Sequence, residues 1–199
     1  MSDIVIIKGK TWSEVIRWEQ PTLVYKAITS ISKVGGSAVI GVVGHGVPEG
    51  WRVAVVSVKG MVEINAANWP LKDKDFHKAT VLTADSIELN DVNAADYKDY
   101  VSGGFVVYRE PVDLTGFAAR MSIKDKVGGT LLESLTSAGG EIDIDTVNYK
   151  ITRTLDAVTT AAFTWKKGVF DMEMVSPDGM PVVTLLDDGA VLIEQEVTT

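Results

Sequence analysis

The sequence predicts an all-β protein in which the strands form a sandwich or a small barrel. Apolar and polar residues alternate along much of the chain, and successive side chains of a β-strand point to opposite faces. Glycine, proline and aspartate separate the alternating runs, as tight turns require. The chain has 199 residues, of which 46% are hydrophobic and 23% charged. This composition is typical of a globular protein with one large or two small domains.

The alternation is clearest in four segments, which in chain order are Thr11–Trp18, Ala119–Lys124, Glu141–Asp145 and Val169–Val175. In each segment we expect one face to be buried and the other to be solvated. The residues on the expected buried faces are Trp12, Glu14, Ile16 and Trp18, then Ala119, Met121 and Ile123, then Ile142 and Ile144, and finally Phe170, Met172 and Met174.

Turn and helix signals lie between these runs. The expected turns are Gly35-Gly36, Gly128-Gly129, Gly139-Gly140 and Ser176–Gly179. Glycine accepts a positive φ and proline presets a negative one, so both suit tight reversals. One segment, 156–163, predicts about two turns of helix with Asp156 as the N-cap. Segments 61–68 and 93–97 each predict a single short turn.

The middle of the chain differs from its two ends. Residues from about 21 to 109 are rich in valine, glycine and alanine, with an irregular stretch between Asn68 and Lys78. Both flanking parts carry the amphipathic pattern described above. The sequence therefore predicts a discontinuous sandwich domain of residues 1–20 plus 110–199, with residues 21–109 inserted as a small β-barrel domain. A surface turn tolerates such an insertion when its two ends lie close together.

Composition also excludes several classes of function. The formal net charge is −8, and no basic block is present, which argues against nucleic-acid binding. No apolar run approaches the roughly 20 residues that span a bilayer. The first residues lack the features of a signal peptide, so we expect folding in a cytoplasm and no membrane partner. Cysteine is absent, which removes disulfides, thiolate zinc sites and cysteine nucleophiles.

The usual signatures of catalysis are missing. The two histidines are His45, between glycines, and His77, in the mixed-charge stretch Lys72–Lys78. We expect His45 to bond nearby backbone groups, and His77 and its stretch to be a solvated loop. Neither histidine has the spacing of a zinc site, and neither G-x-S-x-G nor a phosphate-binding loop is present. The sequence therefore predicts no enzyme, no cofactor and no metal.

Acidic residues suggest one alternative to that prediction. Asp143 and Asp145 alternate along one strand, and Asp187-Asp188-Gly189 resembles an acidic turn. Calcium prefers several carboxylate and carbonyl oxygens, but the spacing differs from that of an EF-hand loop. We interpret these residues as a solvated strand face and a turn, with an opportunistic calcium site as the alternative.

Trp69 is the candidate contact residue. It lies next to Pro70 in the irregular stretch of the middle block, where a core position is hard to assign. Large aromatic side chains are enriched at the centres of protein interfaces, and a monomer gains little from displaying one. The alternative is that Trp69 anchors its own loop.

The two ends of the chain carry four motifs, which are KGKTW near the start, DLTGFAAR after Pro111, the hairpin GGEIDID and the closing strand with Phe170-Asp171. With these motifs the two ends resemble a β-sandwich domain of phage tail, baseplate and fibre-attachment proteins. The family has tyrosine where Phe170 stands, a departure that keeps an aromatic side chain. The resemblance implies an immunoglobulin-like β-sandwich.

The middle block carries its own series of motifs, which are His45-Gly46, GWRV at Gly50–Val53, Gly60-Met61, Asn65, IEL at Ile87–Leu89, Tyr100 and Gly103-Gly104. With these motifs it resembles a second phage module, a small β-barrel related to the first catalytic-cysteine half-domain of ubiquitin-activating enzymes. Together the two resemblances cover nearly the whole chain. This module implies no ubiquitin chemistry, because no cysteine is present.

Together the two resemblances imply a structural protein of a tailed bacteriophage virion. We expect an adaptor of the tail or baseplate, or one that attaches fibres, assembled in the host cytoplasm. Its partners would be other phage virion proteins and further copies of itself, a homo-oligomer. The chain ends, 1–8 and 190–199, and the edge strands are expected to dock on neighbours.

Three alternatives remain beside the tail adaptor. One is a head-decoration or head-to-tail connector protein. Another is a host-glycan or receptor-binding module, in which Trp69, Asp73 and Asp75 would form the sugar-binding patch. The third is a glycosidase with two carboxylates about 5–9.5 Å apart.

Overall fold

The structure is a computed structural model that describes residues 3–180 and 182–196. Strands dominate it, which confirms the all-β class. The chain divides into two compact units. Residues up to Trp18 and those from Val112 onward form one, called here the sandwich unit, and Glu19–Pro111 form the other, called the inserted unit. The sequence predicts these boundaries at residues 20/21 and 109/110.

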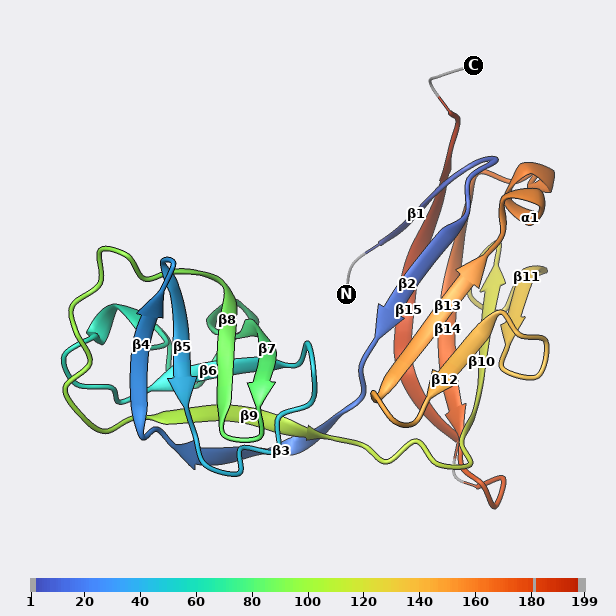
Figure 1. Cartoon of the computed structure of the whole chain (residues 1–199). Coiled ribbons are helices and arrows are strands. Elements are labelled where there is room, and N and C mark those ends of the chain that lie inside the picture. Colours follow the sequence, from blue (N-terminus) through green and yellow to red (C-terminus); the bar gives the residue numbers. More distant parts are fainter. Residues whose placement is uncertain (1–2, 181, 197–199) are drawn as a thin grey trace. The chain divides into compact units, whose positions relative to one another are not determined.

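Two sheets make up the sandwich unit (Figure 1). The larger has the order β1 (Ile4–Ile7), β15 (Val182–Glu194), β14 (Lys167–Val175), β10 (Ala118–Lys124) and β11 (Leu131–Thr136). The smaller has the order β12 (Ile142–Asp145), β13 (Lys150–Leu155) and β2 (Trp12–Ile16). All pairings are antiparallel except that of β1 with β15.

The core of this unit lies on the faces that the sequence predicts. The alternating residues of β10 and β14 are buried, and they pack with apolar side chains of β12 and β13. Trp12, Ile16 and Trp18 are partly buried against the same cluster. The predicted sandwich is confirmed.

Strand β1 joins the two ends of the chain in one sheet. It runs parallel to β15, with Ile4 opposite Val191, and Figure 1 shows the two side by side in blue and red. Ile4 and Ile6 are buried in the core. This pairing was not predicted from the sequence, because it links residues that are far apart in the chain.

The expected acidic turn at 187–189 is wrong, because these residues belong to β15. Gly189 pairs with Phe170 of β14, and a Cβ at this position would lie 2.1 Å from a Phe170 ring carbon. The strand therefore needs glycine here. The side chains of residues 187 and 188 lie outside the described part of the structure.

Arg153 of β13 is buried in the sandwich core. Its Nη2 donates to Oε2 of Glu14, at a distance of 2.5 Å, on the adjacent strand β2. Its guanidinium carbon lies 5.2 Å from the Trp12 ring centroid and 5.5 Å from that of Phe170. Burial lowers the pKa of Arg153, and the Glu14 carboxylate opposes this shift. Glu14 is thus on the buried face because it pairs with a buried cation.

The inserted unit is one seven-stranded antiparallel sheet. Its order is β3 (Glu19–Ala27), β9 (Phe105–Pro111), β6 (Arg52–Val56), β7 (His77–Thr83), β8 (Ser86–Asn93), β5 (Ser37–Gly41) and β4 (Ser30–Val34). The edge strands β3 and β4 do not pair with each other in this described segment. The sheet therefore remains open, and the closure that a small barrel would require is absent.

The short helices are close to the predicted ones. Helix α1 (Ala157–Ala162) begins after Asp156, whose side chain accepts the Thr159 N–H at 2.6 Å. The 3-10 helix η1 (Val62–Ile64) lies within the predicted turn at 61–68. A second one, η2 (Asp73–Asp75), was not predicted. Among the described residues, no helix has the length and apolarity to cross a membrane.

Candidate functional site: a loop that presents Trp69

The candidate site is the segment of residues 66–76 in the inserted unit, called here the Trp69 loop. It connects η1 to β7 and includes η2. At its start, the Ala66 N–H donates to the Val55 carbonyl of β6 at 2.7 Å. Just before it, the Asn65 side chain bonds both the N–H and the carbonyl of Val58. The loop therefore begins from a fixed position on the sheet.

A single carboxylate, that of Asp75, organises the loop from inside. Its Oδ1 accepts the Ala67 N–H at 3.2 Å and the Asn68 side-chain amide at 2.9 Å. Its Oδ2 accepts the Lys72 N–H at 2.7 Å. Asp75 is 5% exposed, and these hydrogen bonds, that from Lys72 first, lower the pKa of its carboxyl group. The bonds connect Ala67 and Asn68, which precede Trp69, to Lys72, which follows it.

The far end of the loop is held by charged and aromatic groups. Arg52 of β6 donates to both carboxylate oxygens of Glu19, at 2.5 and 2.8 Å, and to Asp73 at 3.2 Å. The hydrogen bond with Glu19 is the main cause that raises the pKa of Arg52. The guanidinium groups of Arg52 and Arg109 lie 5.2 and 5.9 Å from the Phe76 ring centroid. Phe76 is thereby fixed where the loop enters β7.

Trp69 lies between these hydrogen-bonded residues in the sequence, and 71% of its surface is exposed. The Trp69–Pro70 peptide bond is cis. Within the described part of the chain, the indole makes no ring stacking and no hydrogen bond. Most of the ring surface is therefore available to a partner.

The exposed charges beside Trp69 are of both signs. Lys72 and Lys74 are exposed, and neither side chain forms an ion pair with a residue that the structure describes. Of the two carboxylates in the same stretch, Asp75 accepts hydrogen bonds inside the loop, whereas Asp73 pairs with Arg52 and keeps 92% of its side chain exposed. The loop thus presents one large aromatic ring together with two lysines and one exposed aspartate.

The sugar-binding patch of Trp69, Asp73 and Asp75 does not form as expected. The Asp75 carboxylate is buried and accepts hydrogen bonds from its own loop. Asp73 lies near Trp69 in sequence but pairs with Arg52. A sugar at Trp69 would therefore lack the Asp75 carboxylate, and the exposed Asp73 would be the one acidic group of the three-residue patch left to bind it.

The stretch Lys72–Lys78 is more ordered than the expected solvated loop. It contains η2 and the buried Asp75, and His77 is the first residue of β7. The His77 Nδ1 lies 3.0 Å from an Asp91 oxygen on β8. His77 is thus a half-buried strand residue paired with a carboxylate, and the expectation of a solvated side chain is wrong.

His45 has the structural role that its glycine neighbours suggest. Its Nδ1 accepts the Val47 N–H at 2.9 Å, which leaves Nε2 to donate to the Thr83 carbonyl, also at 2.9 Å. The Tyr108 hydroxyl donates to the His45 carbonyl at 2.7 Å, and burial raises the pKa of that tyrosine. Both ring nitrogens are therefore occupied by backbone groups.

The acidic residues singled out in the sequence serve local structure. Asp145 accepts the Val147 and Asn148 N–H groups and the Asn148 side-chain amide, so it closes the turn after β12. These bonds, the Asn148 side chain first, lower its pKa. Asp143 lies on the exposed side of the same strand. No group of three or more potential metal-ligating side chains occurs among residues 3–180 and 182–196.

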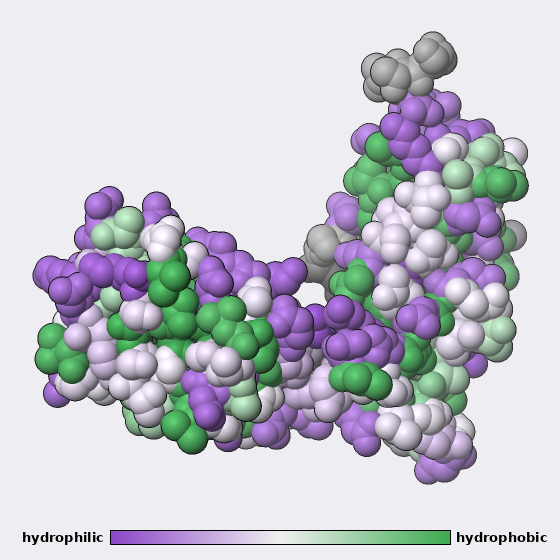
Figure 2. Space-filling model, viewed as in Figure 1, coloured by the Kyte–Doolittle hydropathy of each residue, from purple (hydrophilic) through white to green (hydrophobic). Residues whose placement is uncertain are grey.

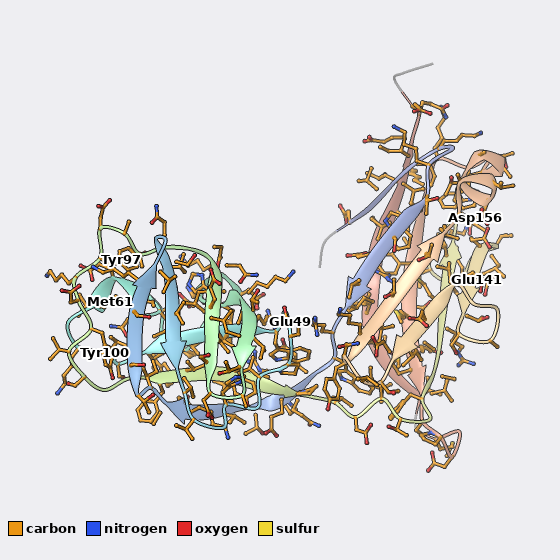
Figure 3. The ribbon with its side chains drawn as sticks, viewed as in Figure 1. Glu49, Met61, Tyr97, Tyr100, Glu141 and Asp156 are labelled. Atoms are coloured by element: carbon orange, nitrogen blue, oxygen red, sulfur yellow. The ribbon has the colours of Figure 1, made fainter. Side chains whose placement is uncertain are left out.

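A hollow on the sandwich unit contains further carboxylates. Glu133, Glu141 and Asp156 line it, and Figure 3 shows the last two side chains. Glu141 accepts the Thr136 N–H at 3.1 Å, and Asp156 caps α1. These groups therefore also have local hydrogen-bonding roles.

Other apolar side chains are exposed at separate places. Figure 2 shows green areas divided by purple ones over the face in view. On the inserted unit, Tyr25 of the edge strand β3 and Phe105 of β9 form an edge-to-face pair with ring centroids 6.2 Å apart, and both are about half-exposed. At one end of this unit lie Tyr97, Tyr100 and the buried Met61 (Figure 3). None of these matches Trp69 in size and exposure.

Sequence reasoning singled out Trp69 as the candidate contact residue but missed the residues that position it. The pairing of Arg52 with Glu19 and the burial of Asp75 carry no recognisable motif. One signal was present: an aspartate three residues after Lys72 fits a side chain that accepts the N–H of residue i−3. Comparison with known proteins adds no name to this site, since no family model matches the chain and no curated protein shows significant similarity to it.

Proposed function

We propose that this chain is a structural protein of a tailed bacteriophage virion, an adaptor of the tail or baseplate or of fibre attachment. Its action is to bind neighbouring protein subunits. The motifs that resemble phage modules in both units support this proposal. The observation that carries it is Trp69, a 71% exposed tryptophan on a loop fixed from inside by Asp75.

A fixed loop is favourable for binding because its conformational entropy is already lost before the partner arrives. Ordering a flexible side chain or loop on association costs about 0.5–1.5 kcal/mol per immobilised side chain. Hydrogen bonds to Asp75 hold the backbone on both sides of Trp69 in the free protein. Tryptophan is also the residue type that contributes most often to the energetic centres of interfaces.

The ends of the chain contribute differently from the expectation. Residues Ile4–Ile7 already pair with Val191–Glu194 in the same sheet, so this part of both ends is engaged within the chain. Residues 1–2 and 197–199 lie outside the described residues. What remains for a neighbour is the outer edge of β1, which has no strand beside it in the described sheet. Unpaired N–H and carbonyl groups of an edge can extend the sheet of another subunit.

The test is immunogold labelling of particles made by a phage whose genome encodes the chain. The proposal expects gold at the tail, in particular at its distal end. Labelling at heads or at the neck would support the head-decoration or connector alternative instead. Particles without label, from cells in which the free protein is abundant, would contradict a virion role.

Trp69→Ala supplies the matched test of the site. We expect the variant to fold normally, because most of the Trp69 side chain is exposed, and to be incorporated into particles at about a tenth of the wild-type level or less. Val43→Ala, which trims another exposed side chain of the same unit, is the control. Incorporation of both variants at the wild-type level would remove Trp69 from the contact.

The receptor-binding alternative has its own readout. A module that binds host glycans through Trp69 would bind isolated host-surface polysaccharide, and Trp69→Ala would abolish this binding. Release of reducing sugar ends from the same polysaccharide would instead favour the glycosidase. The adaptor proposal expects neither result.

A further inference from the structure

Strand β1 is apolar on both of its faces. Its residues are Ile4, Val5, Ile6 and Ile7, of which Ile4 and Ile6 are buried in the sandwich core. Val5 and Ile7 point outward and remain 43% and 38% exposed, and Leu192 beside Val5 on β15 is 40% exposed. A strand that is apolar along its whole length is typical of strands covered on both faces. Among the described residues, only one face of β1 has such a cover.

The sequence of β1 also differs from that of the other edge strands. Proteins usually protect an edge with a charged side chain, a proline or a bulge, because its unpaired N–H and carbonyl groups can bind another strand. In the described sheets, each of the five other edge strands contains at least one such residue. These residues are Glu14 in β2, Pro21 and Lys26 in β3, Lys33 in β4, Glu133 in β11, and Asp143 and Asp145 in β12. Strand β1 contains none.

The main-chain groups of β1 that point to its free edge belong to Val5 and Ile7. The Lys8 N–H donates to the Glu194 carbonyl of β15 at 2.8 Å, and successive residues of a strand point these groups to opposite edges. The Ile7 carbonyl accepts the Lys10 N–H of the following turn at 3.1 Å, and a carbonyl has a second lone pair. Two residues therefore offer N–H and carbonyl groups to a neighbouring strand.

The charges at the two ends of β1 are opposite in sign. Asp3 precedes the strand, is exposed and forms no ion pair with a residue that the structure describes. Lys8 follows the strand, and its Nζ donates to the Phe163 carbonyl at 2.7 Å. In an antiparallel pair of two such strands, the acidic end of each lies beside the basic end of the other. A parallel pair would bring like charges together, which is destabilising.

We propose that β1 pairs antiparallel with β1 of a second copy of this chain. This inference rests on the proposed function, and it names the partner of an edge that the function leaves open. The features of β1 select a second copy, because that copy offers a strand apolar on both faces, two free main-chain residues and end charges in the complementary order. Such a contact uses the same surface on both copies and gives a two-fold dimer.

One register satisfies these features together. Residues opposite each other in an antiparallel pair share a face, so Val5 and Ile7 must lie opposite outward-pointing residues. Val5 of one copy then lies opposite Ile7 of the other, and Ile6 lies on the two-fold axis. Val5 and Ile7 exchange N–H···O bonds in this register, and apolar side chains meet on the outer face. With Val5 on the axis instead, the charged Asp3 would lie opposite Ile7.

The first experiment is sedimentation velocity of the intact protein from about 1 µM to about 1 mM, where we expect a reversible monomer–dimer equilibrium. Val5→Pro removes an N–H that points to the free edge, so it should leave the fold intact and raise the dissociation constant about tenfold or more. Val5→Lys, which keeps the N–H and adds a charge to the edge, should do the same. Val15→Lys, at an exposed residue of the edge strand β2, should leave the constant within about twofold.

Thermal unfolding of each variant monitors the fold. A Val5 variant that unfolds like the wild type and also dimerises like it would overturn the inference. A wild-type protein that remains monomeric over the whole concentration series would do the same, and it would leave the edge of β1 to a strand of a different protein.

The second experiment locates the contact by disulfide formation, since the chain has no cysteine of its own. Residues that exchange hydrogen bonds across an antiparallel pair have Cα atoms about 5.5 Å apart, within the range that a disulfide spans. Oxidation of an equal mixture of the Val5→Cys and Ile7→Cys variants should therefore yield a mixed disulfide dimer. A mixture of Val5→Cys with Val15→Cys is the control. A mixed disulfide no more abundant than in this control would overturn the inference.

The inference and the proposed function can fail separately. Gold on phage tails together with a monomeric protein would overturn this inference alone. A dimer paired through β1, without any label on particles, would instead contradict the proposed function.

Discussion

Asp75 determines the conformation of the loop that carries Trp69, although it lies six residues away in the sequence. Three donors on the two sides of Trp69 converge on the Asp75 carboxylate. An asparagine has the same shape but only one acceptor oxygen, and its NH2 group would face an N–H donor. The position of the exposed ring therefore depends on a buried charge.

We expect Asp75→Asn to loosen the loop without unfolding the sheet. The amide protons of Ala67 and Lys72, which donate to this carboxylate, should exchange several-fold faster with deuterium. Hydrogen exchange read by mass spectrometry measures this, with Asp96→Asn, an exposed residue on another loop, as the control. Unchanged exchange at residues 66–75 would show that other contacts hold the loop.

The same residue gives the loop a defined dependence on pH. Its pKa is lower in the folded protein than the ordinary value of 3.8, so the carboxylate stabilises the fold fully above that value. This stabilisation is lost as the pH falls through the lower, folded-state pKa. Fast exchange at residues 66–75 of the wild-type protein should accordingly begin only below pH 3.8, and loosening near neutral pH would contradict the assignment.

Among the elements, β2 and β13 depend on a charge pair that faces the core. Removal of Glu14 leaves the Arg153 guanidinium buried without its carboxylate, a change that costs about 3–5 kcal/mol in buried pairs. Because the Glu14 side chain is 40% exposed, we expect Glu14→Ala to fall near about 3 kcal/mol. Urea unfolding followed by amide exchange in β13 measures it.

The matched variant removes both charges. An apolar replacement of a buried pair is often neutral or stabilising, so Arg153→Met combined with Glu14→Gln should recover most of the lost stability. If the double variant is as unstable as Glu14→Ala, the packing of Arg153 against Trp12 and Phe170 matters more than its charge.

Elements that depend on local pattern could be predicted from the sequence, and elements that depend on distant partners could not. Strand β10 and helix α1 follow from alternation and from an aspartate N-cap, both visible within a few residues. The parallel pairing of β1 with β15 joins opposite ends of the chain, and no local signal specifies it. The open edge between β3 and β4 likewise depends on how seven strands curve together.

The candidate site shows the same division. The exposure of Trp69 followed from an aromatic residue in a stretch with no core periodicity. The burial of Asp75 did not follow, because the alternating charges of Lys72–Lys78 are typical of a solvated surface. Its donors are two backbone N–H groups and an asparagine amide, so no complementary side-chain charge marks the partner in the sequence.

At the scale of the whole molecule, the two units are joined by neighbouring connections. The Val112 N–H donates to the Trp18 carbonyl at 3.0 Å within the sandwich unit, and Glu19 pairs with Pro111 within the inserted unit. Each unit therefore has its two connection points side by side. The inserted unit can therefore be removed, and a short turn can then join Trp18 to Val112 in the sandwich unit.

We expect a variant in which a short glycine-containing turn joins Trp18 to Val112 to fold as a sandwich on its own. The inserted unit, as residues 19–111, should fold separately. Dispersed amide spectra and cooperative thermal unfolding of each fragment measure this. An unfolded sandwich fragment beside a folded inserted fragment would show that the sandwich needs its insertion.

These neighbouring connections also have a consequence for the order of events on the ribosome. Strands β1 and β2 are synthesised first, but their partners β15 and β13 emerge near the end of the chain. The inserted unit is continuous and can fold while the remainder is still being made. Once it has folded, Trp18 and Val112 are already adjacent, so the entropy of closing this long loop is lost before the sandwich forms. During biosynthesis the folded insertion would then keep the segment that carries β1 and β2 close to the start of the later segment, which contains their partners β15 and β13.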